Sequence, residues 1–371
     1  MPYKIVFDAY HLYHLPQFDP VIDLLLNDNR FEVFLTTSSA NLPDEQNLTK
    51  RIFQRRNVQC IFADNEEERA TKSRAFNPDV FICGWSRYPI EKFVTDKTLV
   101  GMIYHGIGVK PSYWRDNNPR LNIRFVEGPF RIRQLREKGI ETDLELTGFP
   151  KIDPLFNGRI PSREKILKGL GLEPNKKTLL YAPTFYPSSF ESFGLKLPEM
   201  TKDLNLIIKL HQWSYFLEKF SGVNLRRHIT LADKIRKKYP QIVIIEPEHY
   251  NIIDLYQASD VLLTEASSTI YEFMALRKQI IVCDFFKKKI GHHLLPKRLY
   301  LHRLDPEMHG ILTDFCYHIK KPQDLPITLS KCFNQPDPFV ELREKYIGDI
   351  LFKLDGKSSE RVRDSILRRL N

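Results

Sequence analysis

Strand-like and helix-like segments alternate along the first half of this chain. Five short apolar stretches read as strands, and the segments around 21–26, 46–54 and 66–75 have helical periodicity. The predicted strands are 3–10, 31–38, 58–64, 79–85 and 98–106. Alternation of this kind is typical of a parallel sheet with helices on both faces, because parallel strands need crossover connections. The pattern therefore predicts an α/β protein.

The alternation restarts after a segment rich in glycine and proline, GFPKIDPLFNGRIPS at 148–162, which we interpret as a linker. The second set of predicted strands is 178–185, 204–211, 242–248, 261–266 and 279–285. A chain of 371 residues exceeds what one hydrophobic core usually serves. We therefore expect two Rossmann-like domains, at 1–160 and 161–335, followed by a C-terminal helical tail at 336–371.

The segment 260–285 reads as a buried strand, a turn of small residues, an amphipathic helix and a second buried strand. Ser267, Ser268 and Thr269 fall between the first strand and the helix, where they can cap the helix. In open α/β sheets this position binds ligands, and the free N–H groups of a helix start favour phosphate. Glu272 lies in the first turns, where a carboxylate can accept two hydrogen bonds from a ribose diol. The segment predicts a nucleotide site; an ordinary capped core helix with a solvated glutamate is the alternative.

Two similar α/β domains with a nucleotide crevice in the second describe the GT-B architecture, in which the domains face each other across a cleft. Dehydrogenases would need a GxGxxG turn, and the pair Gly106 and Gly108 lacks the third glycine. A GxxxxGK[ST] loop, which a P-loop enzyme requires, does not occur in the sequence. We therefore expect a GT-B fold.

Histidines at the ends of predicted strands are candidates for chemistry. His105 ends the strand 98–106 and precedes a glycine turn, so it can face the cleft and take a proton near neutral pH. Lys110 follows the same turn and can hold an anionic acceptor. His211 ends a strand of the second domain and can donate to a phosphate oxygen. A histidine satisfied within the core is the alternative for His105.

His11 and His14 lie in the predicted loop after the first strand, which borders the cleft in this architecture. They are candidates for binding the acceptor. The neighbouring His292 and His293 point apart on a helix or strand, and no carboxylate has matching spacing for a metal. The five cysteines are widely spaced and form no CxxC pair. We expect no metal and no cofactor.

The net charge of +10 indicates an anionic partner. Motifs of RNA-binding proteins, such as an RNP1 aromatic run, are absent, so we expect no nucleic acid. An anionic membrane surface and a polyphosphate product remain as partners, although any single basic cluster can also be a solvated face. No apolar run approaches the ~20 residues that span a bilayer, and the start of the sequence does not resemble a signal peptide. We expect a cytoplasmic protein, peripheral on the inner face of the cell membrane.

Five motifs, in this order, resemble those of the CDP-glycerol glycerophosphotransferases, the family of teichoic-acid primases and polymerases. They are YHGIGVK at 104–110, TGFPKIDPLF at 147–156, YAPTF at 181–185, IIKLHQ at 207–212 and DLYQASDVLLTEASSTIYEF at 254–273. The resemblance implies a GT-B fold, with an N-terminal acceptor domain and a C-terminal nucleotide-donor domain. It implies transfer of glycerol phosphate from CDP-glycerol, or of a similar polyol phosphate, to a hydroxyl of a lipid-linked or cell-surface polymer, with release of CMP. It matches His105 to the base, and His211, Ser267 and Ser268 to phosphate binders.

The chain departs from the family pattern on the donor side. Glu265 and Ala266 stand where the family usually has aspartate and tyrosine, Tyr186 replaces a basic residue, and Gln212 replaces the proline of KLHP. The activated group can therefore be another polyol phosphate or a sugar. Two further functions stay open: a nucleotide-sugar glycosyltransferase or UDP-sugar 2-epimerase of GT-B fold, and a non-catalytic protein that binds RNA or an anionic polymer.

Overall fold

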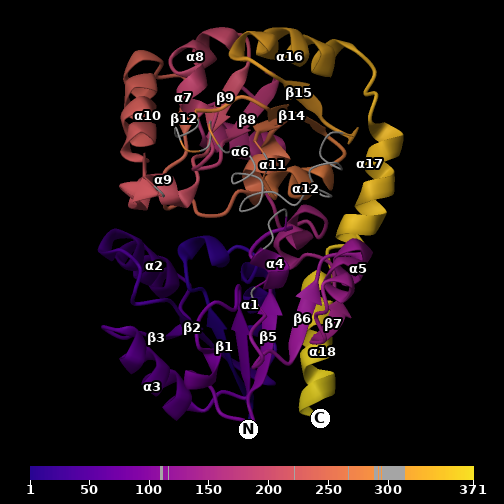
Figure 1. Ribbon diagram of the computed structural model, residues 1–371. Coiled ribbons are helices and arrows are strands. Elements are labelled where there is room, and N and C mark those ends of the chain that lie inside the picture. The colour runs from indigo at the N-terminus through magenta and orange to yellow at the C-terminus, as the bar shows by residue number, and fades with distance from the viewer. Residues whose placement is uncertain are drawn as a thin grey trace. The chain divides into compact units, whose positions relative to one another are not determined.

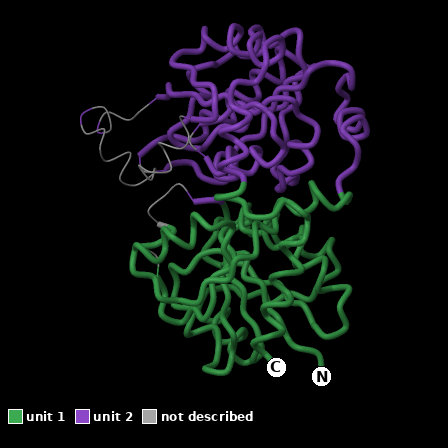
Figure 2. The backbone as a smooth tube through the Cα atoms, turned by 90° about the vertical axis from the view of Figure 1, so that its right-hand side faces the viewer, with its two compact units in different colours: residues 1–106, 112–159, 348–371 green, residues 107–111, 160–347 purple. Residues whose placement is uncertain are grey.

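A computed structural model of the protein describes residues 1–108, 112–115, 117–220, 222–265, 267–287, 291, 294 and 314–371. The chain forms two compact units, coloured green and purple in Figure 2. Unit 1 comprises residues 1–106, 112–159 and 348–371, and unit 2 comprises residues 107–111 and 160–347. Each unit is built around a parallel sheet of its own.

Unit 1 has a seven-stranded parallel sheet in the order β3-β2-β1-β4-β5-β6-β7 (Figure 1). Its strands are β1 Tyr3–Asp8, β2 Phe31–Thr36, β3 Gln59–Ile61, β4 Val80–Cys83, β5 Leu99–Ile103, β6 Ile123–Val126 and β7 Asp143–Leu146. The strand order reverses between β1 and β4, which is the doubly wound arrangement of Rossmann-like domains. The carboxyl ends of β1 and β4 therefore border the position where such sheets bind ligands.

Helices connect the strands of unit 1. The α-helices are α1 Asp19–Leu25, α2 Pro43–Arg55, α3 Glu66–Phe76, α4 Ser112–Arg115, α5 Pro129–Glu137 and α18 Ser358–Leu370, and the 3-10 helices are η1 Leu12–His14, η2 Ile90–Lys92 and η3 Pro150–Leu155. The sequence explains the start of α3: the Asn65 side chain caps it by accepting from the N–H of Glu68 at 2.9 Å. Three glutamates in the first turn suit the positive end of the helix dipole.

The C-terminal residues 336–371, predicted as one helical tail, divide between the two units. Residues up to 347 belong to unit 2, and residues 348–371 belong to unit 1. The buried carboxylate of Asp153 accepts hydrogen bonds from the N–H groups of Ser358 and Ser359, at 3.0 and 2.7 Å, at the start of α18. This helix contacts α1 and η3. Part of the predicted linker is thus a docking site for the last helix.

Unit 2 has a six-stranded parallel sheet in the order β12-β9-β8-β13-β14-β15, and a separate two-stranded antiparallel hairpin. The sheet strands are β8 Thr178–Ala182, β9 Asn205–Ile208, β12 Val243–Ile244, β13 Val261–Thr264, β14 Gln279–Cys283 and β15 Tyr317–Ile319, and the hairpin strands are β10 Lys219–Phe220 and β11 Val223–Asn224. Counted along unit 2, the order repeats the doubly wound pattern, with its reversal between β8 and β13.

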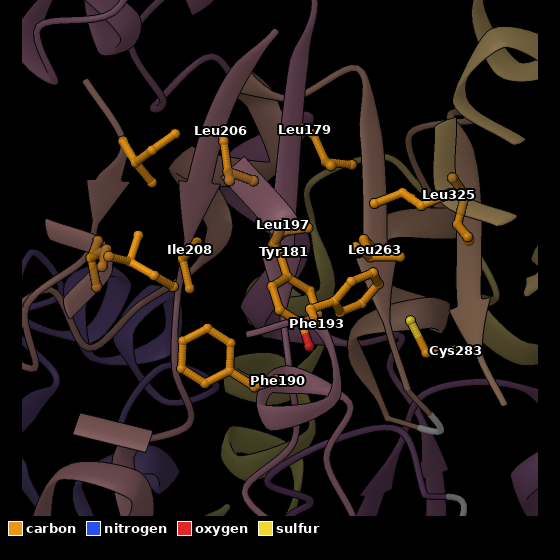
Figure 3. Close-up of a cluster of buried hydrophobic side chains, with 14 of the residues drawn as sticks. Leu179, Tyr181, Phe190, Phe193, Leu197, Leu206, Ile208, Leu263, Cys283 and Leu325 are labelled. Atoms are coloured by element: carbon orange, nitrogen blue, oxygen red, sulfur yellow. The ribbon is translucent and has the colours of Figure 1, made fainter. Parts of the chain in front are cut away.

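The helices of unit 2 cover a sheet whose strands are almost entirely buried. They are α6 Arg163–Gly169, α7 Phe190–Phe193, α8 Lys196–Met200, α9 Gln212–Phe216, α10 Arg226–Lys238, α11 Ile253–Ala258, α12 Thr269–Met274, η4 Pro322–Asp324, α16 Leu325–Asn334 and α17 Val340–Tyr346; the π-helix η5 Ile347–Leu351 crosses the sequence boundary between the units. Figure 3 shows one core cluster, in which Tyr181 of β8 lies among Phe190 and Phe193 of α7 and Leu263 of β13. Buried apolar side chains from both layers fix the sheet against its helices.

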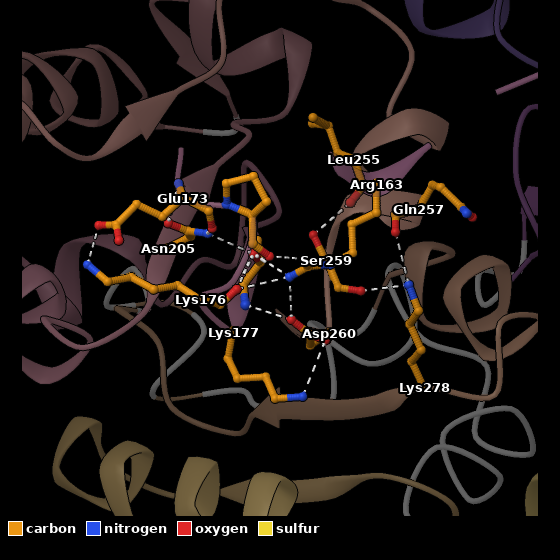
Figure 4. Close-up of polar contacts among 12 residues, drawn as sticks. Arg163, Glu173, Lys176, Lys177, Asn205, Leu255, Gln257, Ser259, Asp260 and Lys278 are labelled. Carbon is orange, nitrogen blue, oxygen red and sulfur yellow. Dashed lines mark hydrogen bonds and ion pairs between the residues drawn. The ribbon is translucent and has the colours of Figure 1, made fainter. Parts of the chain in front are cut away.

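Polar contacts tie together the amino ends of the strands in unit 2 (Figure 4). Asp260 accepts hydrogen bonds from the N–H of Thr178 at 2.8 Å and from Arg163 at 3.0 Å. Lys278 donates to the carbonyl of Ser259 at 2.7 Å and to two further carbonyls at the end of α11. Burial lowers the pKa of Lys278 to about 8. Ligands of such sheets bind at the opposite edge, so this network has a structural role.

A buried histidine of unit 2 predicts a loss of stability in acid. His228 of α10 is 3% exposed, and burial lowers its pKa to about 4 from the ordinary 6.5. As pH falls through this interval the unfolded chain takes up the proton first, so the native state loses stability, by up to about 3 kcal/mol. His228→Gln, which cannot ionise, should lose less free energy of unfolding between pH 6.5 and pH 4 in urea titrations. Equal losses for the two proteins would contradict the prediction.

Several of the basic residues that contribute to the net charge are paired with carboxylates in the structure. Arg56 pairs with Asp19 and Asp23, and Arg133 pairs with Asp349 at 2.7 Å. Arg131 is buried and pairs with Glu127. Lys288 and Lys289 lie outside the described residues. Among the described residues, no helix has the length and apolar character to cross a membrane.

Candidate active site

The carboxyl ends of β1, β4 and β5 carry the candidate residues of unit 1. A pocket at this edge is lined by Gly84, Trp85, Ser86, Arg87, Met102, Tyr104, His105 and Tyr113. Gly84, Trp85, Ser86 and Arg87 directly follow β4, and Tyr104 and His105 directly follow β5. The pocket therefore lies beside the strand-order reversal, as expected for a ligand site in this topology.

His105 has a defined orientation in this pocket. Its Nδ1 lies 3.1 Å from the carbonyl oxygen of Gly84. Because a carbonyl can only accept, Nδ1 carries the proton in this hydrogen bond, and Nε2 is the acceptor nitrogen of the neutral ring. A Cβ at position 84 would lie 3.1 Å from His14 and from Gln17, so glycine allows this strand end to approach them closely.

His11 and His14 come to the same edge of the sheet as His105. Nδ1 of His11 lies 3.2 Å from the buried carboxylate of Glu45 on α2, which also accepts from the N–H of Leu12. The His14 ring stacks on the His105 ring at a centroid distance of 4.8 Å. His14 is fully buried, and burial lowers its pKa well below 6.5. It has no exposed surface for an acceptor, whereas His11, at 14% exposed, keeps some.

Lys110, the other predicted acceptor ligand, lies outside the described residues. Sequence reasoning also missed most of the pocket. Trp85, Arg87 and Tyr113 belong to no motif, although Trp85 is the last residue of the strand predicted at 79–85. Gln17 is buried near His14, and neither polar atom of its amide has a hydrogen-bond partner among the described residues.

In unit 2, the ends of β8 and β13 are joined by Glu265. Its buried carboxylate accepts from the N–H of Thr184 at 2.6 Å and from the N–H of Ser189 at 2.7 Å, and it also accepts from the Ser189 hydroxyl. Burial raises the pKa of Glu265. These bonds fix the loop after β8 at the strand-order reversal. The glutamate that departs from the family pattern is therefore an organiser of the loop, which sequence reasoning did not predict.

Ser267, Ser268 and Thr269 lie where the sequence analysis expects them, between β13 and α12. All three side chains are partly exposed, and the hydroxyl of Thr269 lies 3.4 Å from that of Thr264 at the end of β13. The helix has six residues; its N-cap residue Ser268 makes no side-chain cap, and the Ser267 hydroxyl accepts from the N–H of Thr269 at 3.4 Å. The helix dipole is correspondingly small. Any phosphate binding here depends mainly on the hydroxyls and backbone N–H groups.

His211 follows the carboxyl end of β9, which pairs with the other side of β8. It is the N-cap of α9, and its Nδ1 accepts from the N–H of Trp213 at 3.1 Å. This hydrogen bond puts the proton of the neutral ring on Nε2, which makes Nε2 a donor. The ring packs against Phe185 at a centroid distance of 4.7 Å. The arrangement suits a group that donates to a phosphate oxygen.

Glu272 is fully buried on α12. The hydroxyl of Tyr256 donates to its Oε2 at 2.9 Å. In this structure the carboxylate is covered, so a ribose could reach it only if neighbouring groups move. The predicted ribose contact remains a prediction.

The sequence of the chain is similar to that of known glycerophosphotransferases. Residues 137–289 match the family described as CDP-Glycerol:Poly(glycerophosphate) glycerophosphotransferase. A teichoic acid poly(glycerol phosphate) polymerase of Bacillus spizizenii is 31% identical over 137 residues, which cover 36% of this chain and 33% of the relative. A teichoic acid glycerol-phosphate primase of Bacillus subtilis is 31% identical over 134 residues, or 36% of this chain and 31% of the relative. The matches thus span about a third of the length of these relatives.

The fold is similar to that of the wall teichoic acid polymerase TagF, with a TM-score of 0.69 at 14% identity over 99% of this chain and 88% of that chain. It is also similar to a UDP-GlcNAc 2-epimerase from Neisseria meningitidis bound to UDP-GlcNAc, with a TM-score of 0.57 at 14% identity over 99% and 100% of the two chains. These likenesses confirm the GT-B fold class. The family that residues 137–289 match is the one predicted from the motifs. The matched range includes the residues of unit 2 that are predicted to bind the donor, and His105 lies outside it.

Proposed function

We propose that this chain, whose residues 137–289 belong to the CDP-glycerol glycerophosphotransferase family, transfers glycerol phosphate or a similar polyol phosphate from a CDP-activated donor to an acceptor hydroxyl. The observation that carries the proposal is the orientation of His105, whose Nδ1 contacts the Gly84 carbonyl beside a pocket at the ligand edge of unit 1. The family match over residues 137–289 supports a CDP-activated donor.

In the proposed reaction, Nε2 of His105 accepts the proton of the acceptor hydroxyl. The oxygen attacks the donor phosphorus that carries the polyol, a new P–O bond forms, and the bond from that phosphorus to the CMP oxygen breaks. CMP leaves with the bonding electron pair. Charge spreads over the phosphoryl oxygens during this step, so positioning and electrostatic stabilisation supply most of the catalysis.

On the donor side, we assign the phosphates to His211, Ser267, Ser268 and Thr269. The three hydroxyl residues follow β13 and His211 follows β9, two strands that flank β8 in the sheet of unit 2. The acceptor, a lipid-linked or cell-surface polymer, is assigned to the edge of unit 1 with His11 and Lys110. A crystal structure with CDP-glycerol tests the donor assignment, and phosphates bound away from Ser267 would contradict it.

Glu272→Gln is expected to weaken nucleotide binding, because we assign this carboxylate to the ribose diol. Loss of one charge-assisted hydrogen bond should reduce the binding free energy by about 1.5–3 kcal/mol, measured by calorimetry with CDP. Tyr256→Phe is the matched control, since it removes the hydroxyl that donates to Glu272 without changing the carboxylate. Unchanged CDP affinity in the Glu272→Gln protein would exclude the ribose assignment.

We also propose that the protein binds anionic membranes peripherally. The net charge of +10 and a lipid-linked acceptor both favour this location, and each basic residue near the surface contributes roughly 1 kcal/mol. The protein should sediment with vesicles that contain anionic lipid, and salt should release it. Equal sedimentation with neutral and anionic vesicles would contradict the proposal.

A donor screen tests the proposed function. The purified protein is incubated with an acceptor and with CDP-glycerol, CDP-ribitol or UDP-GlcNAc, and the released nucleotide is identified. CMP from a CDP-polyol supports the proposal. The fold likeness to a UDP-GlcNAc 2-epimerase makes conversion of UDP-GlcNAc the main rival outcome. Binding without any turnover would favour the non-catalytic alternative.

A further inference from the structure

Four aromatic rings in unit 1 form a column that includes His105. The His14 ring stacks on His105 at 4.8 Å with 29° between the planes. Tyr113 covers His105 at 5.4 Å and 30°, and Tyr104 stacks on Tyr113 at 5.2 Å and 26°. We define these four residues as the ring column. Three separate chain segments contribute to it: the 3-10 helix η1, the end of β5 and the short helix α4.

The Tyr104 end of the ring column is fixed by buried polar groups. The Tyr104 hydroxyl donates to the backbone carbonyl of Tyr113 at 3.3 Å and accepts from the buried guanidinium of Arg124 at 2.9 Å. Arg124 also donates to Asn117 at 2.7 Å. The guanidinium of Arg131 lies 5.5 and 5.1 Å from the ring centroids of Tyr104 and Tyr113. These contacts hold Tyr113 in place beside His105.

The His14 end is fixed by packing alone. His14 is fully buried, and neither ring nitrogen has a hydrogen-bond partner among the described residues. Tyr13 contacts the His14 ring edge-on at 4.5 Å and the His105 ring at 5.6 Å. The His14 ring therefore acts on its neighbour His105 through the stacked ring face. The rings of His14 and Tyr113, which pack on the His105 ring, restrict its rotation about the contact of Nδ1 with the Gly84 carbonyl.

We propose that His14 is a positioning residue: its buried ring, with Tyr113, holds the His105 imidazole so that Nδ1 stays on the Gly84 carbonyl and Nε2 stays aimed as the base. This inference rests on the proposed function, in which His105 deprotonates the acceptor. It assigns His14 a role different from the acceptor contact predicted from the sequence. The charged groups around the ring column include Arg124, which donates to Tyr104, Arg131 with its partner Glu127, Arg87 of the pocket, and Glu45, which pairs with His11.

The test compares two substitutions of one residue. His14→Ala removes the ring, and His14→Phe keeps an aromatic ring in the slot without its nitrogens. A misplaced base should cost about 10²-fold in turnover, so His14→Ala is expected to lower kcat by that factor while the KM for donor changes little. His14→Phe should recover most of this loss. Tyr113→Leu, which removes the ring from the other face of His105, should lower kcat in the same direction if His14→Ala fails to fold.

A readout that needs no turnover separates this inference from the proposed function. Nitrogen-15 NMR of the histidine rings should show His105 protonated at Nδ1 in the wild-type and His14→Phe proteins, and a mixture of tautomers in His14→Ala. Two results would overturn the inference: a folded His14→Ala protein with wild-type turnover and tautomer, or a folded His14→Phe protein that loses as much as His14→Ala. If no CDP-polyol is turned over, the proposed function fails, and the tautomer comparison still decides the role of His14.

Discussion

Replacing His105 with alanine is expected to lower turnover by a factor of about 10² to 10⁴, the usual contribution of general acid-base catalysis. The reason is geometric: the Gly84 carbonyl accepts from Nδ1, which leaves Nε2 as the proton acceptor beside the pocket of unit 1. The measurement is kcat of the purified variant with its CDP-polyol donor and acceptor. His105→Gln, which keeps a hydrogen-bonding side chain but has no basic nitrogen, should be similarly impaired.

Donor binding is the internal control for this substitution. The residues assigned to the donor lie in unit 2, so CDP affinity should be nearly unchanged in His105→Ala. A parallel loss of CDP affinity and turnover would indicate that the substitution disrupts the fold of the protein. Wild-type turnover in a folded His105→Ala protein would show that this histidine is structural, and the proposed mechanism would be wrong.

Replacing Arg69 with methionine is expected to reduce the free energy of unfolding by about 3–5 kcal/mol. The guanidinium and its partner Asp8 are both fully buried, with their nearest atoms 3.0 Å apart. Without Arg69, the carboxylate at the end of β1 keeps the hydrogen bond from Tyr88, at 2.6 Å, and has no cation paired with it among the described residues. Phe93 also loses the cation above its ring, 4.4 Å from the centroid. Urea unfolding of the two proteins measures the effect.

The surface pair Arg133–Asp349 of unit 1 provides the matched control. Its side chains are 55% and 32% exposed, so Arg133→Met should cost less than about 1 kcal/mol. Burial raises the pKa of Asp8, and loss of the cation should raise this pKa further. Lowering the pH should therefore reduce the difference in free energy of unfolding between Arg69→Met and the wild type, because protonation of Asp8 removes its unpaired charge. A cost equal to that of Arg133→Met would contradict the account of this buried pair.

The sequence predicts most of the two sheets, because long apolar strands alternate with helical segments. It fails where a strand is short or interrupted. No strand is predicted at β6, because the polar Arg124 interrupts its apolar run. In the structure the guanidinium of Arg124 donates to Tyr104 and Asn117, which only the fold brings near. The three-residue strand β15 is also absent from the prediction.

The return of the C-terminus to unit 1 could not be predicted from local pattern. The helix α18 begins at Ser358, and the carboxylate that accepts its first N–H groups is Asp153, about 200 residues earlier in the chain. Sequence rules for helix starts look for a capping residue next to the helix. A cap supplied by a distant residue is invisible to them.

The candidate site is predicted in part. The strand-end positions of His105 and His211 follow from the apolar runs before them, and the structure places both at the carboxyl ends of strands. The stacking of His14 on His105 depends on the strand order of the sheet, which brings the end of β1 close to β4 and β5. The loop contacts of Glu265 likewise require β8 and β13 to be neighbours.

The most direct test of the central claim is the identity of the nucleotide that the purified protein releases from CDP-glycerol in the presence of a lipid-linked acceptor. The proposed reaction predicts CMP, formed in step with glycerol phosphate attached to the acceptor, and about 10²-fold or more lost in His105→Ala. CDP-ribitol measured in parallel decides between the two polyol donors. Release of no CMP from either donor, together with conversion of UDP-GlcNAc, would contradict the account.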